Sequence, residues 1–227
     1  MPFSFQHRFG FVHIQKTGGV SLVAALREAG VALDFMDRGL EALLDAHPHG
    51  ALLRSSLLRT FPFAPVAAMP QEHMPAMILR ALVGPDVWDA SFTFAFVRNP
   101  WARAVSLYAY LRARSEQEEF SGRRPDMVAI MDRSPDFSSF LRETSTSADM
   151  TARVIGEDGR LLVSFVGRYE TLASDIARVE ERIGLRVNLP HLNASEHGDY
   201  RAYYSPSDRE LVARQYARDI ERFGYSF

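Results

Sequence analysis

Residues 9–29, FGFVHIQKTGGVSLVAALREA, decide the fold. The stretch opens with a short aromatic and β-branched run, Phe9 to Ile14, which is typical of a strand. Gln15-Lys16-Thr17-Gly18-Gly19 follows at once, and its two glycines allow a tight turn. From Val20 to Ala29 the apolar residues recur with the spacing of a helix. The sequence therefore predicts a strand, a tight loop and a helix in direct succession.

The same order recurs further along the chain. The run Phe92 to Val97 is almost continuously apolar, as in a strand buried on both faces. It is followed by Arg98-Asn99-Pro100 and by a helical pattern over residues 101–112. Asn99 is a good N-cap, and Pro100 suits the first helical position because its missing N–H costs nothing there. A second strand, loop and helix are predicted.

A third apolar run, 161–166, is followed by Gly167-Arg168-Tyr169-Glu170 and an amphipathic helix near 172–183. Arg168, Tyr169 and Glu170 are expected either to orient a ligand or to have a structural role. The remaining elements are weaker or lie between these units: strands at 31–36 and 66–69, helices around 40–46 and 207–223, and a loop-rich insertion with one helical turn around 115–137.

Strands that alternate with helices predict an α/β fold with a mostly parallel central sheet covered on both faces. Ligands of such folds bind at the carboxyl ends of the strands. The loops 15–19, 98–100 and 167–170 should lie on that edge and converge on one site.

Composition narrows the class of protein. The 227 residues, 47% hydrophobic and 24% charged, suit a single globular domain over 1–227. No stretch approaches the roughly 18 apolar residues of a membrane span, and the N-terminus has no signal-peptide pattern. The absence of cysteine excludes disulfides and thiolate ligands, so a cytoplasmic location is expected. A net charge of −2 argues against a nucleic-acid partner.

Lys16 is the one lysine among the 26 lysine and arginine residues, which indicates that the chemistry at this position needs an amine. The backbone N–H groups of a tight turn and the positive end of the following helix attract an anion. Lys16 and the hydroxyls of Thr17 and Ser21 add side-chain donors. Because the lysine precedes the glycines, the loop lacks the Walker spacing GxxxxGK[ST], which disfavours a nucleotide triphosphatase. A plain glycine-rich turn is the alternative.

A second anion site is predicted at the next loop. Arg98 follows a buried strand, and Ser106 lies about two turns into the following helix, so both can reach the same side of the helix start. Two separated anion sites suggest a ligand with two phosphate-like ends.

The strings FVHIQKTGGVSL and FAFVRNPWARAVSLYAYL resemble the two signatures with which carbohydrate 2-O- and 4-O-sulfotransferases and their bacterial relatives bind 3′-phosphoadenosine 5′-phosphosulfate (PAPS). SFVGRYETL, LPHLNAS and FGYSF are similar to the same group, so the resemblance covers most of the chain. It implies a three-layer α/β/α sandwich, similar to P-loop nucleoside-triphosphate hydrolases. Gln15 departs from the proline usual in the family, which we expect to alter loop stiffness.

The resemblance also implies the roles of individual residues. Arg98 and Ser106 would bind the 3′-phosphate of PAPS. The 5′-phosphosulfate would be bound by Lys16, Thr17, Gly18, Gly19, Val20 and Ser21. Lys16 would also stabilise the charge that develops on the leaving phosphate.

A general base is needed to take the acceptor's proton, and histidine suits this task with an unperturbed pKa of ~6.5. His73 is our choice, because its place in the chain is similar to that of the family's catalytic histidine. The alternative is a loop histidine with a structural role, with His47 and His49 in reserve. His13, inside the first strand, is expected to be a core residue. No metal is expected.

The sequence thus predicts a PAPS-dependent O-sulfotransferase whose acceptor is a hydroxyl compound, a carbohydrate or glycolipid. Two alternatives stay open: a P-loop-like nucleotide kinase, which would need Mg²⁺ and a carboxylate near the loop, and a catalytically inactive nucleotide-binding domain.

Overall fold

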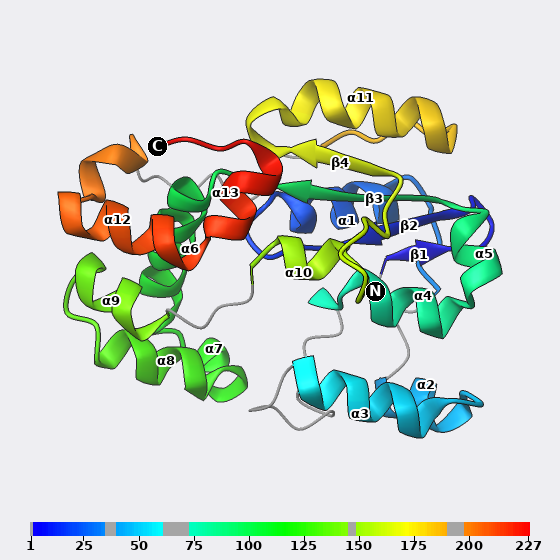
Figure 1. Ribbon diagram of the computed structural model, residues 1–227, viewed down its shortest axis with the longest axis horizontal. Coiled ribbons are helices and arrows are strands. Elements are labelled where there is room, and N and C mark those ends of the chain that lie inside the picture. The colour runs from blue at the N-terminus through cyan, green and yellow to red at the C-terminus, as the bar shows by residue number, and fades with distance from the viewer. Residues whose placement is uncertain (1, 35–39, 61–72, 145–148, 190–197) are drawn as a thin grey trace. The chain divides into compact units, whose positions relative to one another are not determined.

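The computed structural model describes residues 2–34, 40–60, 73–144, 149–189 and 198–227 (Figure 1). The chain forms two compact units. Residues 1–97 and 152–192 make the first, which holds the sheet, and residues 98–151 and 193–227 make the second, which is helical. Each unit is therefore built from two separate segments of the chain.

The first unit contains a sheet with the strand order β1-β2-β3-β4, namely Phe3–Ser4, Phe9–Val12, Phe92–Val97 and Phe165–Arg168. β1 pairs antiparallel with β2, whereas β2, β3 and β4 are parallel. In the register, Val12 lies opposite Ala95, and Val97 lies opposite Arg168. The predicted mixed α/β fold with a mostly parallel sheet is confirmed.

One face of the sheet carries the core of this unit. Side chains alternate between the faces of a strand, so Phe9 and Phe11 of β2 share a face, as do Phe94 and Phe96 of β3; all four are almost fully buried. Two helices pack on them, α1 (Gly19–Glu28) and α11 (Leu172–Ile183). Both predicted helices are confirmed, and Figure 1 shows α11 running beside β4.

The opposite face is contacted by α5 (Pro85–Asp89), which follows α4 (Ala76–Val83) and directly precedes β3. Gly10 alternates with Phe9 and Phe11, and a Cβ atom on it would lie 3.2 Å from the Trp88 ring of α5. Trp88 is buried, and its Nε1 donates to the carbonyl of Leu162 at 2.7 Å. Helices therefore contact both faces of the sheet.

The two weaker strand predictions, 31–36 and 66–69, are not confirmed. Residues 31–34 of the predicted strand 31–36 form no strand; Val31 and Leu33 are buried in the core cluster, and the N–H of Asp34 donates to the carbonyl of Phe3 at 2.8 Å. The prediction was wrong because burial of alternate residues in a connection imitates a strand. The predicted strand 66–69 lies outside the described residues.

The third strong strand is displaced along the sequence. β4 spans Phe165–Arg168 rather than 161–166, and Leu161 forms an isolated bridge with Ile155. Between β2 and β3 the described residues form α2 (Leu40–Ala46), which was predicted, and α3 (Gly50–Thr60), which was not, in addition to α1, α4 and α5.

The second unit begins with α6 (Pro100–Arg114), whose start is as predicted. Oδ1 of Asn99 accepts the N–H groups of Trp101 at 3.1 Å and Ala102 at 3.3 Å, and Pro100 is the first helical residue. The capped start fixes where the chain turns after β3.

The prediction of a loop-rich insertion around 115–137 was wrong, because this segment is mostly helical. It contains α7 (Glu118–Arg123) and α8 (Pro125–Asp132), and α9 (Phe137–Glu143) follows. Acidic residues in the first turn of α7 complement the helix dipole, and Pro125 fits the first position of α8. Charged, glycine- and proline-containing sequence here marks short helices and their ends, not a loop.

The rest of the chain adds short helical elements. α10 (Thr151–Val154) precedes β4, and a 3₁₀ turn covers Tyr169–Thr171 before α11. A second 3₁₀ turn, Tyr200–Tyr203, is followed by α12 (Pro206–Gln215) and α13 (Ala217–Phe223), so the predicted helix 207–223 is interrupted at Tyr216.

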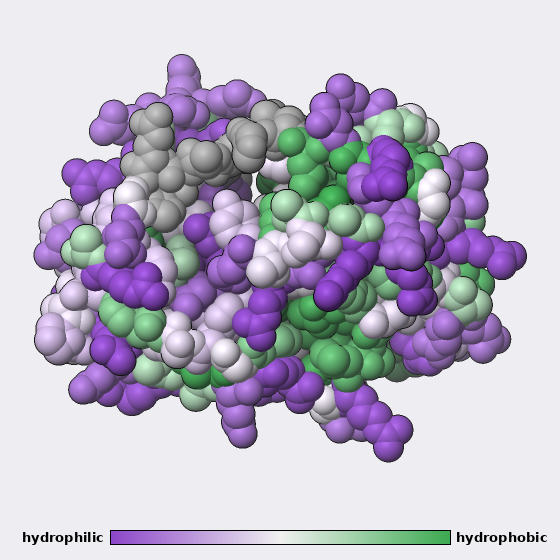
Figure 2. All heavy atoms as spheres, turned by 90° about the horizontal axis from the view of Figure 1, so that it is seen from above, coloured by the Kyte–Doolittle hydropathy of each residue, from purple (hydrophilic) through white to green (hydrophobic). Residues whose placement is uncertain are grey.

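Hydrophilic side chains form much of the surface visible in Figure 2, and hydrophobic residues gather on the right-hand part of this view. In the described part of the chain, no helix combines the length and the apolar character that crossing a membrane requires.

Candidate active site

The loop between β2 and α1 is built around Thr17, which is fully buried. Its hydroxyl donates to the carbonyl of Ile14 at 2.8 Å and so closes the turn that carries Lys16. The hydroxyl proton of Thr17 is therefore used inside the loop. Toward a bound anion, this residue would contribute its backbone N–H.

Two residues of the loop have left-handed backbone conformations, Lys16 with φ 66° and Gly18 with φ 87°. For a residue with a Cβ atom this region costs about 1–2 kcal/mol, so the surrounding contacts must hold Lys16 in place. Turns of this kind let successive N–H groups point to one side and form an anion-binding concavity. The loop has the backbone shape that the sequence predicted for it.

α1 starts directly after this turn, and no side chain caps its first residue. Its N-cap residue is Gly18, which has no side chain to cap the helix. The first turn, Gly19-Val20-Ser21, contains no acidic side chain, and Val20 is exposed. A helix N-terminus without a side-chain cap presents backbone N–H groups at the positive end of the helix dipole, which favours an anion.

Gly19 is required for a different reason, a close approach by His13. A Cβ atom at position 19 would lie 2.0 Å from Cδ2 and 2.3 Å from Nε2 of the His13 imidazole. His13 is buried just after β2, and its ring stacks on Phe11 with centroids 5.5 Å apart. Burial, followed by the neighbouring charge of His73, holds the pKa of His13 well below 6.5.

His73 lies beside this arrangement, in the same unit. Its Nδ1 is 3.1 Å from the backbone carbonyl oxygen of His13, and the two rings meet edge to face with centroids 4.5 Å apart. The guanidinium of Arg153, on α10, donates to the carbonyl of His73. The predicted base and the predicted anion loop are thus linked through His13.

The third predicted loop meets the first one. A Cβ atom on Gly18 would lie 3.3 Å from both Tyr169 and Leu172. Asp175 of α11 fixes this segment, because its Oδ2 accepts the N–H of Arg168 at 2.8 Å and the hydroxyl of Thr171 at 2.7 Å. Of the three loops expected to converge, those after β2 and β4 lie against each other, and Tyr169 packs on the turn at Gly18.

The residues predicted for the second anion site lie in the second unit. Arg98 is the residue directly after β3 and is buried, and its backbone N–H donates to the sulfur of Met150 at 3.4 Å. Ser106 is buried on α6. The structure thus groups Lys16 to Ser21 with His73 in one unit, and Arg98 with Ser106 in the other.

Comparison with known proteins identifies the family. The model of the sulfotransferase family matches residues 4–226, almost the entire chain. The chain belongs to the sulfotransferase family. An uncharacterized protein of Archaeoglobus fulgidus is 30% identical over 132 residues, which cover 56% of this chain and 98% of that relative. The chain is therefore a transferase of sulfuryl groups.

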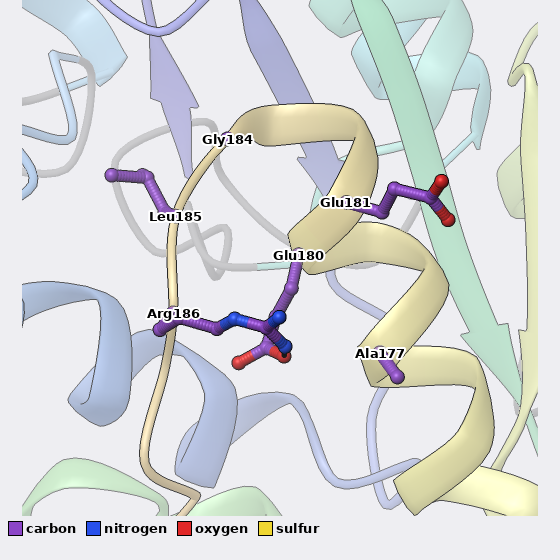
Figure 3. A pocket seen from close by; sticks show the side chains of 6 residues that line it. All are labelled: Ala177, Glu180, Glu181, Gly184, Leu185 and Arg186. Carbon is purple, nitrogen blue, oxygen red and sulfur yellow. Dashed lines mark hydrogen bonds and ion pairs between the residues drawn. The ribbon is translucent and has the colours of Figure 1, made fainter.

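A hollow elsewhere on the sulfotransferase is not part of this site. It has a volume of about 540 Å³ and lies at the C-terminal end of α11 (Figure 3), where it is lined by Ala177, Glu180, Glu181, Gly184, Leu185 and Arg186. Glu180 is already paired there, with Arg186 at 3.0 Å and with the N–H of Val187 at 2.7 Å. None of the residues predicted from the sequence lines it.

His47 and His49, the alternative candidates for the base, interact with each other in the sulfotransferase. Nδ1 of His47 accepts the N–H of His49 at 3.1 Å, so one potential ligand atom of the pair is used within the turn. Across the described residues, no three His, Cys, Asp or Glu side chains are grouped so that they could hold a metal ion.

Sequence reasoning missed the part that His13 plays between the loop and His73. One signal was present, since alternation along β2 places His13 on the same face as Phe9 and Phe11 and predicts burial. Nothing in the sequence indicated the contact of His13 with Gly19, because the need for a tight turn was a sufficient reason for that glycine.

Proposed function

We propose that this sulfotransferase transfers the sulfuryl group of PAPS to a hydroxyl of a carbohydrate or glycolipid. The proposal is carried by one observation: in a chain of this family, the left-handed turn at Lys16 leads into the uncapped start of α1 next to a histidine. Sulfotransferases of this family generally use PAPS as donor, which supports the assignment of the loop.

The residues present fit the two anionic ends of PAPS. The N–H groups of the α1 start, with the ammonium of Lys16 and the hydroxyl of Ser21, match the 5′-phosphosulfate. The guanidinium of Arg98 and the hydroxyl of Ser106 match the 3′-phosphate. Both of these last side chains are buried, and charge-assisted hydrogen bonds are stronger where water is excluded.

The reaction breaks the bond between sulfur and the bridging phosphate oxygen and forms a bond between sulfur and the acceptor oxygen. Lys16 and the α1 N-terminus stabilise the negative charge that develops on the leaving phosphate. His73 takes the proton of the acceptor hydroxyl. The proton stays on the imidazole until it is released to solvent, so no metal is needed in this scheme.

The finer description of the fold belongs to the same proposal. Helices on both faces of a mostly parallel sheet support a three-layer, P-loop-like α/β/α sandwich. We further propose that residues 1–227 fold as a single domain. A cytoplasmic location stays a prediction from the sequence.

Calorimetric titration with 3′-phosphoadenosine 5′-phosphate (PAP), with ADP and ATP–Mg²⁺ as comparators, tests the donor assignment. We expect preferential binding of PAP and a loss of at least about tenfold (~1.4 kcal/mol) in Lys16→Ala and in Arg98→Ala. Arg160→Ala is the matched control, because this arginine is largely exposed in a turn outside the site.

Other outcomes of the titration separate the alternatives. A preference for ATP with Mg²⁺ would favour a nucleotide kinase. PAP binding without sulfuryl transfer to any of a panel of sugars and glycolipids would favour an inactive nucleotide-binding domain. No nucleotide binding would refute the proposed donor.

A further inference from the structure

The His13 imidazole lies between two groups that the proposed reaction uses. On one side it occupies the space where a Cβ atom of residue 19 would be, with Cδ2 and Nε2 at 2.0 and 2.3 Å from that position. On another side it meets the ring of His73 at a centroid distance of 4.5 Å and an angle of 64°. The ring is held from a third side by Phe11.

The backbone of His13 also defines the protonation of His73. A carbonyl oxygen can only accept a hydrogen bond, so the 3.1 Å contact from His73 Nδ1 to the His13 oxygen requires the proton on Nδ1. In the neutral ring, the lone pair is then on Nε2. Neutral histidine in water prefers the opposite tautomer, so this hydrogen bond selects the less common form.

His73 is fixed from its other end as well. Arg153 donates to the His73 carbonyl, which ties the residue to α10. Among the groups facing His73, Arg153 is cationic, whereas His13 stays neutral because its burial lowers its pKa. A neutral His13 does not compete with His73 for the acceptor's proton.

We propose that His13 is a positioning residue that holds the anion loop at Gly19 and the base His73 in one arrangement, with Nε2 of His73 as the proton-accepting atom. This inference rests on the proposed function for the roles of the loop and of His73. It adds the connection between them and the identity of the reacting nitrogen. One imidazole then transmits a displacement of either group to the other.

The tautomer is measured on the ligand-free protein by two-bond ¹⁵N–¹H correlation NMR of the labelled histidine rings. We expect the Nδ1–H form at His73 in the wild type. Gly19→Ala should push the His13 ring away and increase the Nε2–H population at His73, and His13→Ala should do the same. Ile176→Val, which trims the core on α11, controls for a general loss of stability and should leave the tautomer unchanged.

The loop side is measured by titration with PAP. His13→Ala should raise the dissociation constant of PAP about tenfold, whereas Ile176→Val should leave it unchanged. An Nε2–H tautomer in the wild type would overturn the proposal. So would wild-type behaviour of either the tautomer or PAP binding in His13→Ala.

Two provisions keep these results interpretable. If His13→Ala does not fold, Gly19→Ala probes the same link from the other end, and a wild-type tautomer in that variant refutes the link. If the wild type does not bind PAP, the proposed donor is wrong, while the tautomer data still decide whether residue 19 and His73 are coupled.

Discussion

Asn99 ties the end of the described chain to the start of α6, because its Nδ2 donates to the carbonyl of Ser226 at 2.8 Å. The same side chain caps the helix through Oδ1. The ring of Phe227 packs next to it on Trp101, with centroids 5.6 Å apart. The residue that follows Arg98 is thus fixed by both a helix cap and the last residues of the sequence.

Asn99→Ala should lower the free energy of unfolding by about 1–2 kcal/mol, the usual effect of losing an N-cap, and should weaken PAP binding through Arg98. Asn99→Asp is the matched variant, since it keeps the capping oxygen but loses the donor to Ser226. Urea denaturation and calorimetry measure the two effects. If Asn99→Asp binds PAP as Asn99→Ala does, the contact with Ser226 matters; if it binds like the wild type, only the cap does.

Gly18→Ala should lower the free energy of unfolding by about 1–2 kcal/mol from the left-handed conformation, and by more from the contacts at 3.3 Å with Tyr169 and Leu172. It should also weaken PAP binding. Gly159→Ala is the control, because its φ of 76° is similar but a Cβ atom there meets nothing within 4 Å. Equal effects of the two substitutions on stability would show that Tyr169 and Leu172 move away from the new Cβ atom without an energetic cost.

Stability should fall on acidification below pH 6.5 because of His13. Its pKa is lowered in the folded protein, so the unfolded chain binds the proton more readily. The contribution of His13 is therefore fully present above its unfolded pKa of 6.5 and is lost as the pH falls toward the folded value. Urea denaturation between about pH 5 and about pH 8, a range that brackets this pKa, measures how the free energy of unfolding changes with pH.

His13→Phe should reduce that slope, since phenylalanine does not titrate and keeps a buried ring. His49→Phe, at an exposed position, should retain the wild-type dependence. An unchanged slope in His13→Phe would mean that acid sensitivity arises from other groups.

The two compact units should unfold in a single transition. Each is assembled from two separate segments, and the chain passes from one to the other between Val97 and Arg98 and again between Thr151 and Ala152. Neither unit can therefore form from a continuous piece. Scanning calorimetry checks this by comparing the calorimetric and van't Hoff enthalpies, which should agree. Two resolved transitions would contradict the single domain.

The strong periodic segments were predictable, and the connections were not. β2, β3, α1, α6 and α11 followed from long apolar patterns and from the cap at Asn99. β1 has only Phe3 and Ser4, too few residues for a pattern, and forms by pairing with β2. The helices at 118–132 are short, so their polar composition resembled a loop.

In the site, residue types and order were predictable, whereas contacts across the fold were not. Lys16, the glycines and the histidines could be chosen from chemistry and chain position. The sequence contained no indication that the Thr17 hydroxyl bonds to Ile14, or that Tyr169 lies against Gly18. Such relations depend on how β2 and β4 are placed in the sheet, which local patterns do not encode.

Because the His13 ring occupies the space of a side chain at position 19, protein engineering has to treat these two positions together. A larger residue at 19 fits only if residue 13 becomes smaller, so a single-site library at position 19 will contain mostly defective variants. Libraries that change both positions together are the ones in which altered loops can be found. Redesign of the loop between β2 and α1 should therefore begin with this pair.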